Sequence, residues 1–245
     1  MHWGLFLEDA PFGGKYYHWL LSGTLTTVQV FICAWILALA AGTVFGILRT
    51  VPGRPWRLLG TLYAEIFRNF PLITQLFIWY LVVPEILPFG WGEWIKSVRP
   101  HLQFFIYAVL CLGFFTGARV CEQVRSGIES LSSSQRQAGL ALGLTLFQTY
   151  RHVLLPNAFR IILPPMTSEM LNLVKNSAVV SAIGLLDLVA QAYRMLDYSA
   201  YAYESFIAIT VIYVLLNFAV MGLMRLLGRR AALPGPAEHH GGGRA

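Results

Sequence analysis

Five polar side chains lie close together inside a segment of the chain that is otherwise apolar. Ser168, Asn172 and Lys175 recur at i, i+4 and i+7, so a helix places them on one face. Glu169 and Asn176 flank that face. Ionisable side chains are costly inside an apolar span and mark functional positions by default. The stripe either lines a path for a polar solute or hydrogen-bonds helices together, and the sequence leaves both open.

A second set of charges, Glu65 and Arg68, interrupts the apolar run that starts near Leu59. The i, i+3 spacing lets the two side chains pair on one helix face. We favour this neutralising ion pair within the span over contact with a solute. Pro71 follows three residues later and is expected to kink the same helix.

No arrangement of residues for catalysis accompanies these charges. An enzyme in the membrane would need a His/Asp/Glu cluster or an activated nucleophile, but His18, His101 and His152 are scattered along the chain. The sequence contains no Gly-x-x-x-x-Gly-Lys-Ser/Thr motif for ATP. We expect no cofactor and no metal on this chain. The His239–His240 pair is interpreted as part of a solvated tail.

The composition is that of a polytopic membrane protein. Of 245 residues, 56% are hydrophobic and 12% are charged, whereas a soluble domain carries about 25% charge. A helix that crosses the bilayer needs about 20 mostly apolar residues. The sequence therefore predicts an all-α fold with about five spans: Thr24–Leu48, Leu59–Val83, Phe104–Val120, Met166–Leu186 and Phe206–Met224.

The basic residues outside these spans fall mostly on one side. Eleven follow the first, third and fifth spans, and four lie on the other side, at Lys15, Lys96, Arg99 and Arg194. Cytoplasmic loops carry the excess of Lys and Arg. We therefore expect residues 1–16 outside the cell, a membrane domain over 17–228 and a disordered cytoplasmic tail over 229–245. The basic residues behind the net charge of +6 are distributed as the membrane topology predicts, so the charge indicates no nucleic-acid partner.

A polar gap separates the third and fourth spans, and residues 134–156 within it, here called the hairpin, carry helix start and stop signals. Ser134 and Gln137 fit one capping box, and Thr145 and Gln148 fit a second. Gly143 suits a left-handed helix stop between them, and Pro156 is expected to end the second helix. Two short helices hinged at Gly143 follow. The alternative is an amphipathic connector that lies on the membrane.

The hairpin resembles the cytoplasmic coupling loop of ABC importer permeases. The family pattern is Glu-Ala-Ala, a Gly six residues after the Glu, then nine residues and apolar-x-Leu-Pro. Gln137 stands where the family has Glu, and Gly139 stands where it has the second Ala. The residues that fall in register with the pattern are Ala138, Gly143, Val153, Leu155 and Pro156.

Two further stretches narrow this resemblance. The run from Tyr63 to Gln75 is similar to the second-span signature of histidine/glutamate/aspartate-type permeases, and residues 155–177 look like glutamate/aspartate import permeases. The resemblance covers about Gly14 to Arg229. It implies a bacterial inner-membrane importer with a second permease subunit, two ATP-binding subunits and a periplasmic amino-acid-binding protein. ATP hydrolysis would then lie on a partner chain.

Two other functions remain to be distinguished. The chain could be a permease for another polar amino acid, since the soluble binding protein selects the substrate in such systems. A secondary transporter would need no ATPase, but such folds usually carry inverted repeats, and we find none. The ATP dependence of uptake separates the last alternative from the importer.

Overall fold

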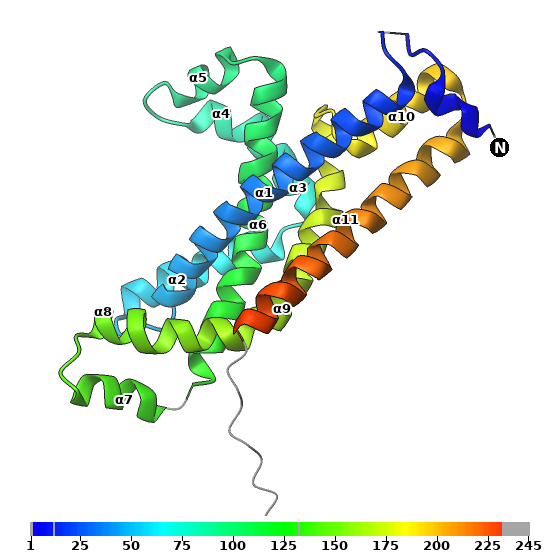
Figure 1. Ribbon diagram of the computed structural model, residues 1–245. Coiled ribbons are helices and arrows are strands. Elements are labelled where there is room, and N and C mark those ends of the chain that lie inside the picture. The colour runs from blue at the N-terminus through cyan, green and yellow to red at the C-terminus, as the bar shows by residue number, and fades with distance from the viewer. Residues whose placement is uncertain (1, 12, 132, 232–245) are drawn as a thin grey trace, which may run out of the picture.

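The computed structural model describes residues 2–11, 13–131 and 133–231, and these residues form helices without any strand. The all-α prediction is confirmed. Residues 229–231, expected to belong to a disordered tail over 229–245, instead belong to the last helix, so that part of the prediction is wrong. The rest of the tail, from residue 232 onward, lies outside the described residues. Three long helices are apolar enough to cross a membrane, and Figure 1 shows them running between the two ends of the molecule: α1 (Tyr16–Leu48), α6 (Pro100–Glu129) and α11 (Ala202–Ala231).

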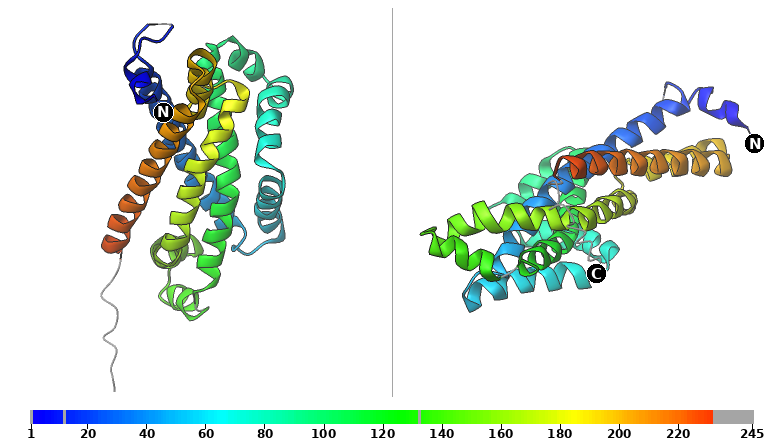
Figure 2. Two further views of the ribbon diagram at one scale, coloured as in Figure 1. Left: turned by 90° about the vertical axis from the view of Figure 1, so that its right-hand side faces the viewer. Right: turned by 60° about the horizontal axis from the view of Figure 1, so that its bottom comes forward.

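Helix α6 is the centre of the packing, with α1 pressed against it through small residues. A Cβ atom on Gly42 would lie 2.6 Å from the side chain of Val120, and one on Gly46 would lie 2.8 Å from Val124. Glycines four residues apart let two helix backbones approach closely in a membrane. The α1–α6 pair therefore forms a framework that several of the other helices contact (Figure 2).

The predicted second span is broken, not merely kinked. Helix α2 (Arg54–Asn69) and the helical run from α3 (Leu72–Phe77) through η2 (Ile78–Val82) to α4 (Val83–Ile86) meet at 106°. Pro71 forces Phe70 into an extended conformation, which ends α2. Buried Gln75 donates from Nε2 to the carbonyls of Phe67 and Phe70, at 2.8 and 2.9 Å. This amide replaces the backbone donors lost at the break.

A small helix that the sequence did not reveal covers one end of this span. Helix α5 (Trp91–Ser97) packs on α4, where Gly92 lies directly against the Pro84 carbonyl. Lys96 binds Glu85 at 2.8 Å and Glu93 at 3.2 Å. The hydrogen bond to Glu85 is the main reason that the pKa of the Lys96 ammonium lies above its ordinary value.

The predicted fourth span is also bent. Helix α9 (Leu155–Asn176) passes into the 3-10 turn η4 (Ser177–Ile183), and α10 (Leu188–Ser199) leaves at 51°. Gly184 has φ +91° at the turn. Asp187 caps α10 by accepting from the Ala190 amide at 2.9 Å. The Leu188 amide donates to Thr27 on α1 at 3.1 Å, which anchors the bend to the framework.

The two ends of the molecule differ in what they hold. Figure 1 shows η1 (Trp3–Leu7), α5 and α10 at one end and the hairpin at the other, on the side where α11 ends. The hairpin consists of α7 (Ser133–Ala141), α8 (Leu146–Thr149) and the π-helical turn η3 (Tyr150–Leu154). The N-terminus and the end of α11 therefore lie at opposite ends, as an odd number of spans requires.

Candidate functional site

The turn of the hairpin is built as the sequence predicts. Gly143 has φ +79°, a left-handed conformation that costs glycine little. The Leu144 amide donates to the Gly139 carbonyl at 3.2 Å, and the Gly143 amide donates to Leu140 at 3.0 Å. These two bonds form a Schellman motif, which satisfies the last carbonyls of α7. The helix stop predicted at Gly143 is confirmed.

The second helix of the hairpin begins with the predicted capping box. The Gln148 amide donates to Thr145 Oγ1 at 3.2 Å, and the Thr145 amide donates to Gln148 Oε1 at 2.8 Å. The first box differs, because α7 already begins at Ser133 and Ser134 lies inside it. Gly139 packs against Thr149, where a Cβ would lie 2.9 Å from Thr149 Cγ2. This contact explains why an alanine would not fit at 139.

Pro156 does not end the second helix, so that prediction is wrong. The backbone continues from α8 through η3 into α9, with Pro156 near the start of α9. The Leu155 amide donates to the carbonyl of Tyr150, five residues back. The wider π turn leaves room for the proline ring, which would clash in an ordinary α turn. Val153, Leu155 and Pro156 therefore join the hairpin rigidly to the long helix α9.

The tip of the hairpin presents apolar side chains that the described part of the chain leaves largely uncovered. Leu142 is 81% exposed and Phe147 is 71% exposed. Gln137 and Ala138 are also exposed on α7, whereas Val153 and Leu155 are half-buried. An exposed helical knob of this kind suits a groove on a partner, into which the apolar side chains would insert.

The polar stripe on α9 divides into a buried part and an exposed part. Glu169 lies against Arg119 of α6, with Nη1 and Oε2 3.9 Å apart, and Asn172 adds a polar contact to the same carboxylate. Ser168 and Lys175 are exposed, and Asn176 is half-buried. Among the described residues, no carboxylate lies within ion-pair distance of Lys175. The stripe on α9 thus combines a contact with α6, through Glu169, and a cation, Lys175, that is unpaired among the described residues.

Arg119 is the site residue that sequence reasoning left without a role. Its guanidinium lies 5.0 Å above the ring of Phe115, and the side chain is 38% exposed, while its buried Nε has no hydrogen-bond partner among the described residues. The stripe on α9 gives no sign of it, because the pairing is across two helices. A lone arginine within the apolar sequence of α6 was the available signal.

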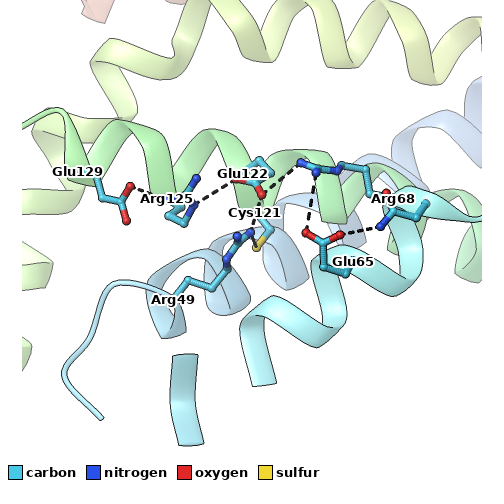
Figure 3. A network of polar contacts seen from close by, with 8 residues as sticks. Arg49, Glu65, Arg68, Cys121, Glu122, Arg125 and Glu129 are labelled. Carbon is cyan, nitrogen blue, oxygen red and sulfur yellow. Dashed lines mark hydrogen bonds and ion pairs between the residues drawn. The ribbon is translucent and has the colours of Figure 1, made fainter. Parts of the chain in front are cut away.

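The predicted Glu65–Arg68 pair exists but belongs to a larger network (Figure 3). Arg68 lies 3.8 Å from Glu65 but 3.2 Å from Glu122 of α6. Asn69 donates to the other oxygen of Glu65 at 2.6 Å. The Glu65–Arg68 ion pair predicted from the sequence is therefore one edge of a network that joins α2 to α6.

Glu122 is the centre of this network. It accepts from Arg49 at 2.8 Å and from Arg125 at 3.1 Å, in addition to Arg68. Arg125 continues to Glu129 at 2.6 Å. Burial alone would lower the pKa of Arg49, but the hydrogen bond to Glu122 raises it, so the guanidinium stays charged. The network ties the ends of α1, α2 and α6 together just before the hairpin begins.

Comparison with known proteins identifies the relatives of this arrangement. Residues 34–233 match the family model described as "Binding-protein-dependent transport system inner membrane component". The chain is 59% identical over 236 residues, 96% of each chain, to the glutamate/aspartate import permease protein GltJ of Escherichia coli (strain K12). It is 30% identical to the probable glutamine ABC transporter permease protein GlnM of Bacillus subtilis (strain 168), over 87% of this chain and 89% of the relative.

Solved structures give the same result. A crystal structure of an amino acid ABC transporter with histidines matches at a TM-score of 0.72 and 27% identity, over 88% of this chain and 95% of that one. An inward-facing MetNI methionine ABC transporter also matches at 0.72, at 21% identity over 88% and 97% of the chains, which shows the fold alone. These matches confirm the predicted permease fold. By length and composition the described residues provide three spans, or up to five if each bent helix pair counts as one, which agrees with the predicted number.

Proposed function

The chain belongs to the family of binding-protein-dependent transport system inner membrane components and is a multi-pass permease, and from this premise we propose that it carries glutamate or aspartate into the cell in an ATP-driven importer. The observation that supports the ATP-driven mechanism best is the hairpin, whose tip exposes Leu142 and Phe147 on two capped helices. The substrate is inferred from the Escherichia coli relative, GltJ, which is 59% identical to this chain over 236 residues.

The proposed partners come from the family to which the chain belongs, and the surfaces that the chain leaves uncovered are consistent with them. Two ATP-binding subunits hydrolyse the ATP, and one of them receives the hairpin in a groove. A second permease subunit completes the path, and a periplasmic binding protein delivers the amino acid. In the most apolar stretch of α11 only 11% of the residues are buried, so this helix has a large surface for lipid or for the second permease.

The hairpin faces the cytoplasm in this proposal, and the N-terminus faces the periplasm. Eleven basic residues against four support that orientation, as does the position of the hairpin opposite η1 (Figure 1). Alkaline phosphatase fused after Ser134 should be inactive, and phosphatase fused after Trp94 should be active. High activity at Ser134 would put the hairpin out of reach of any ATPase.

The path for the substrate runs along the polar face of α9 and its contact with α6. An acidic amino acid carries net negative charge, and desolvating it near the bilayer centre requires positive charge nearby. Lys175 is exposed without a paired carboxylate in the described part of the chain, and Arg119 is only partly neutralised by Glu169. These two cations are our candidates for contact with the substrate, and Ser168 and Asn176 lie beside them.

The decisive experiment measures uptake of labelled glutamate into proteoliposomes that contain the complete importer. Uptake should require ATP and the binding protein, and excess aspartate should compete while glutamine does not. Competition by glutamine alone would favour the function named for the Bacillus subtilis relative. Uptake without ATP would favour a secondary transporter.

Lys175→Met tests the path within the same assay. We expect a lower maximal uptake with an unchanged affinity of the binding protein for glutamate, because the charge acts only on the substrate in transit. Lys175→Arg is the control that keeps the charge. If a cysteine at this position resists water-soluble thiol reagents in the assembled importer, the stripe serves helix contact and not transport.

A further inference from the structure

A cavity of about 580 Å³ lies beside the hairpin, between the ends of α1, α2 and α6. Four arginines line it: Arg49, Arg57, Arg125 and Arg136. The remaining residues that the argument uses are Glu129 and the hydroxyl side chains of Thr50 and Thr61. We call this cavity the basic pocket. Its size is that of a small-ligand site.

The basic pocket keeps an excess of positive charge after all its ion pairs are made. Among the described residues, Glu129 is the one acidic residue that lines it, and Glu122 pairs with both Arg49 and Arg125 (Figure 3). Four arginines less two glutamates leaves a charge of +2. Within the described residues, neither Arg57 nor Arg136 has a carboxylate at ion-pair distance. The pocket therefore carries positive charge that no carboxylate of the described residues neutralises.

The chemistry of the lining favours a phosphate group. Guanidinium groups bind phosphate oxygens through paired N–H donors, and hydroxyl groups add further donors. The Tyr150 hydroxyl already binds the Thr50 hydroxyl at 3.2 Å, so the wall that joins the hairpin to α1 is polar. A neutral or cationic ligand would leave the +2 charge uncompensated.

Helix α2 favours a membrane lipid as the source of such a phosphate group. Its residues form three faces: one carries Arg57 and Thr61 toward the pocket, one packs on α1 and α6, and one is apolar and open. The open face includes Leu58 and Leu62, which are 59% and 48% exposed and follow Arg57 and Thr61 around the helix, and Trp56 is exposed at the start of the helix. A basic helix with an open apolar face and a tryptophan at its end is typical of the membrane interface.

We propose that the basic pocket binds the phosphate of an anionic phospholipid and that this headgroup holds α7 against α1 and α2. Arg136 on α7 and Arg57 on α2 both bind the phosphate from the lining of the pocket, while acyl chains lie along the open face of α2. The bound lipid thereby fixes the hairpin relative to the framework helices. The proposal depends on the proposed function in one respect: the orientation of the importer assigns the bound lipid to the cytoplasmic leaflet.

Lipid retention by the intact importer tests this proposal without any transport assay. The complex is purified, exposed to equal amounts of phosphatidylglycerol and phosphatidylcholine, and examined by native mass spectrometry. The wild type should retain phosphatidylglycerol selectively. Arg57→Gln with Arg136→Gln should weaken retention about 25-fold, from about fivefold for each arginine near a membrane surface.

The matched control removes the same charge elsewhere. Arg54 on α2 and Arg160 on α9 are exposed and do not line the pocket, so Arg54→Gln with Arg160→Gln should retain phosphatidylglycerol like the wild type. Equal losses in the two double variants would reduce the effect to general surface charge and overturn the proposal. A melting temperature of each complex, measured in parallel, shows that the variants are folded.

Two further arms separate the sources of the anion. Inorganic phosphate at millimolar concentration should leave the retained lipid in place, because the acyl chains add to its binding. Complete displacement by phosphate would make a soluble anion the ligand and overturn the lipid assignment. Retention only by complexes that have lost their ATPase subunits would mean that an acidic segment of the ATPase fills the pocket, which also overturns it.

Discussion

The α1–α6 contact and the hairpin both depend on glycine, for opposite reasons. At Gly42 the backbone is ordinary helix and the neighbours leave no room, since a Cβ would lie 2.6 Å from Val120. At Gly143 a Cβ would meet no atom of the described residues within 4 Å, but φ is +79°. The first glycine permits two helices to touch, and the second permits a chain reversal. Substitutions in the two regions should therefore fail in different ways.

Gly42→Val should have the largest effect on folding. The added side chain would overlap both Val120 and the Gly117 carbonyl oxygen, which lies 2.7 Å from the Cβ position. Overpacking in a close-packed interior costs about 1–3 kcal/mol. We expect less protein in the membrane and a lower melting temperature of the purified permease.

The control for Gly42→Val is Gly222→Ala on α11, where a Cβ meets nothing within 4 Å. Alanine is favoured over glycine in a helix by about 0.5–1 kcal/mol. That variant should melt at the same temperature or slightly higher. Equal destabilisation by both substitutions would mean that α1 and α6 do not meet as closely as the geometry requires.

Glu122→Gln comes next, because it removes the charge at the centre of the network. Arg49, only 10% exposed in its side chain, would lose its carboxylate partner. Hydrogen bonds between charged groups contribute about 1.5–3 kcal/mol, so we expect a loss near the middle of that range. Thermal unfolding measures it, and Glu129→Gln, at a side chain 51% exposed, should cost less than about 1 kcal/mol.

The sequence predicts contacts well where they are local. The Schellman motif at Gly143 and the capping box of Thr145 and Gln148 involve residues within five positions of each other, so short patterns are enough to predict them. The equally short Ser134–Gln137 pattern did not mark the start of α7, which begins at Ser133. Pro71 was recognised as a disruption, but the sequence pattern did not identify Gln75, whose amide satisfies the freed carbonyls of Phe67 and Phe70. The break at Pro71 is a local effect, whereas the hydrogen bonds that satisfy the carbonyls at the break depend on how the Gln75 side chain packs.

The contacts that escape the sequence join separate helices. Glu122 pairs with Arg125 on its own helix, as its spacing indicates, but its shortest ion pair is with Arg49, 73 residues earlier. Arg119 and Glu169 likewise come from α6 and α9. Pro156 was assigned a helix stop because a π turn, which accommodates the ring, has no signal in the sequence.

Gly143→Val should damage coupling more than folding. A left-handed conformation costs a residue with a side chain about 1–2 kcal/mol, enough to open or re-form a short exposed turn. We expect the permease to reach the membrane in normal amount, while ATP hydrolysis in proteoliposomes no longer drives glutamate uptake. Gly143→Asn is the matched control, because asparagine enters the left-handed region readily. Normal uptake by the valine variant would show that the reversal at 143 is not needed.

Phe147→Ser should have the smallest effect on folding. The ring is 71% exposed in the permease alone, and substitutions at such positions usually change stability by less than about 0.5 kcal/mol. In the importer the same ring would fill a groove of the ATPase, where burying an aromatic side chain contributes about 1.5–3 kcal/mol. Co-elution of the ATPase with the permease on a sizing column should therefore fall while the melting temperature of the permease stays constant.

Leu7→Ser is the matched control for Phe147→Ser, because Leu7 is a similarly exposed apolar residue, at 66%, in η1 at the opposite end of the molecule. It should leave ATPase binding unchanged. If both serine variants bind the ATPase like the wild type, the exposed tip is not the contact surface. Coupling would then have to pass through the stiff part of the hairpin, where Val153 and Leu155 join it to α9. If only Phe147→Ser loses the partner, the contrast with Gly42 is complete: one region of the chain is built to pack on itself, and the other is built to pack on a different protein.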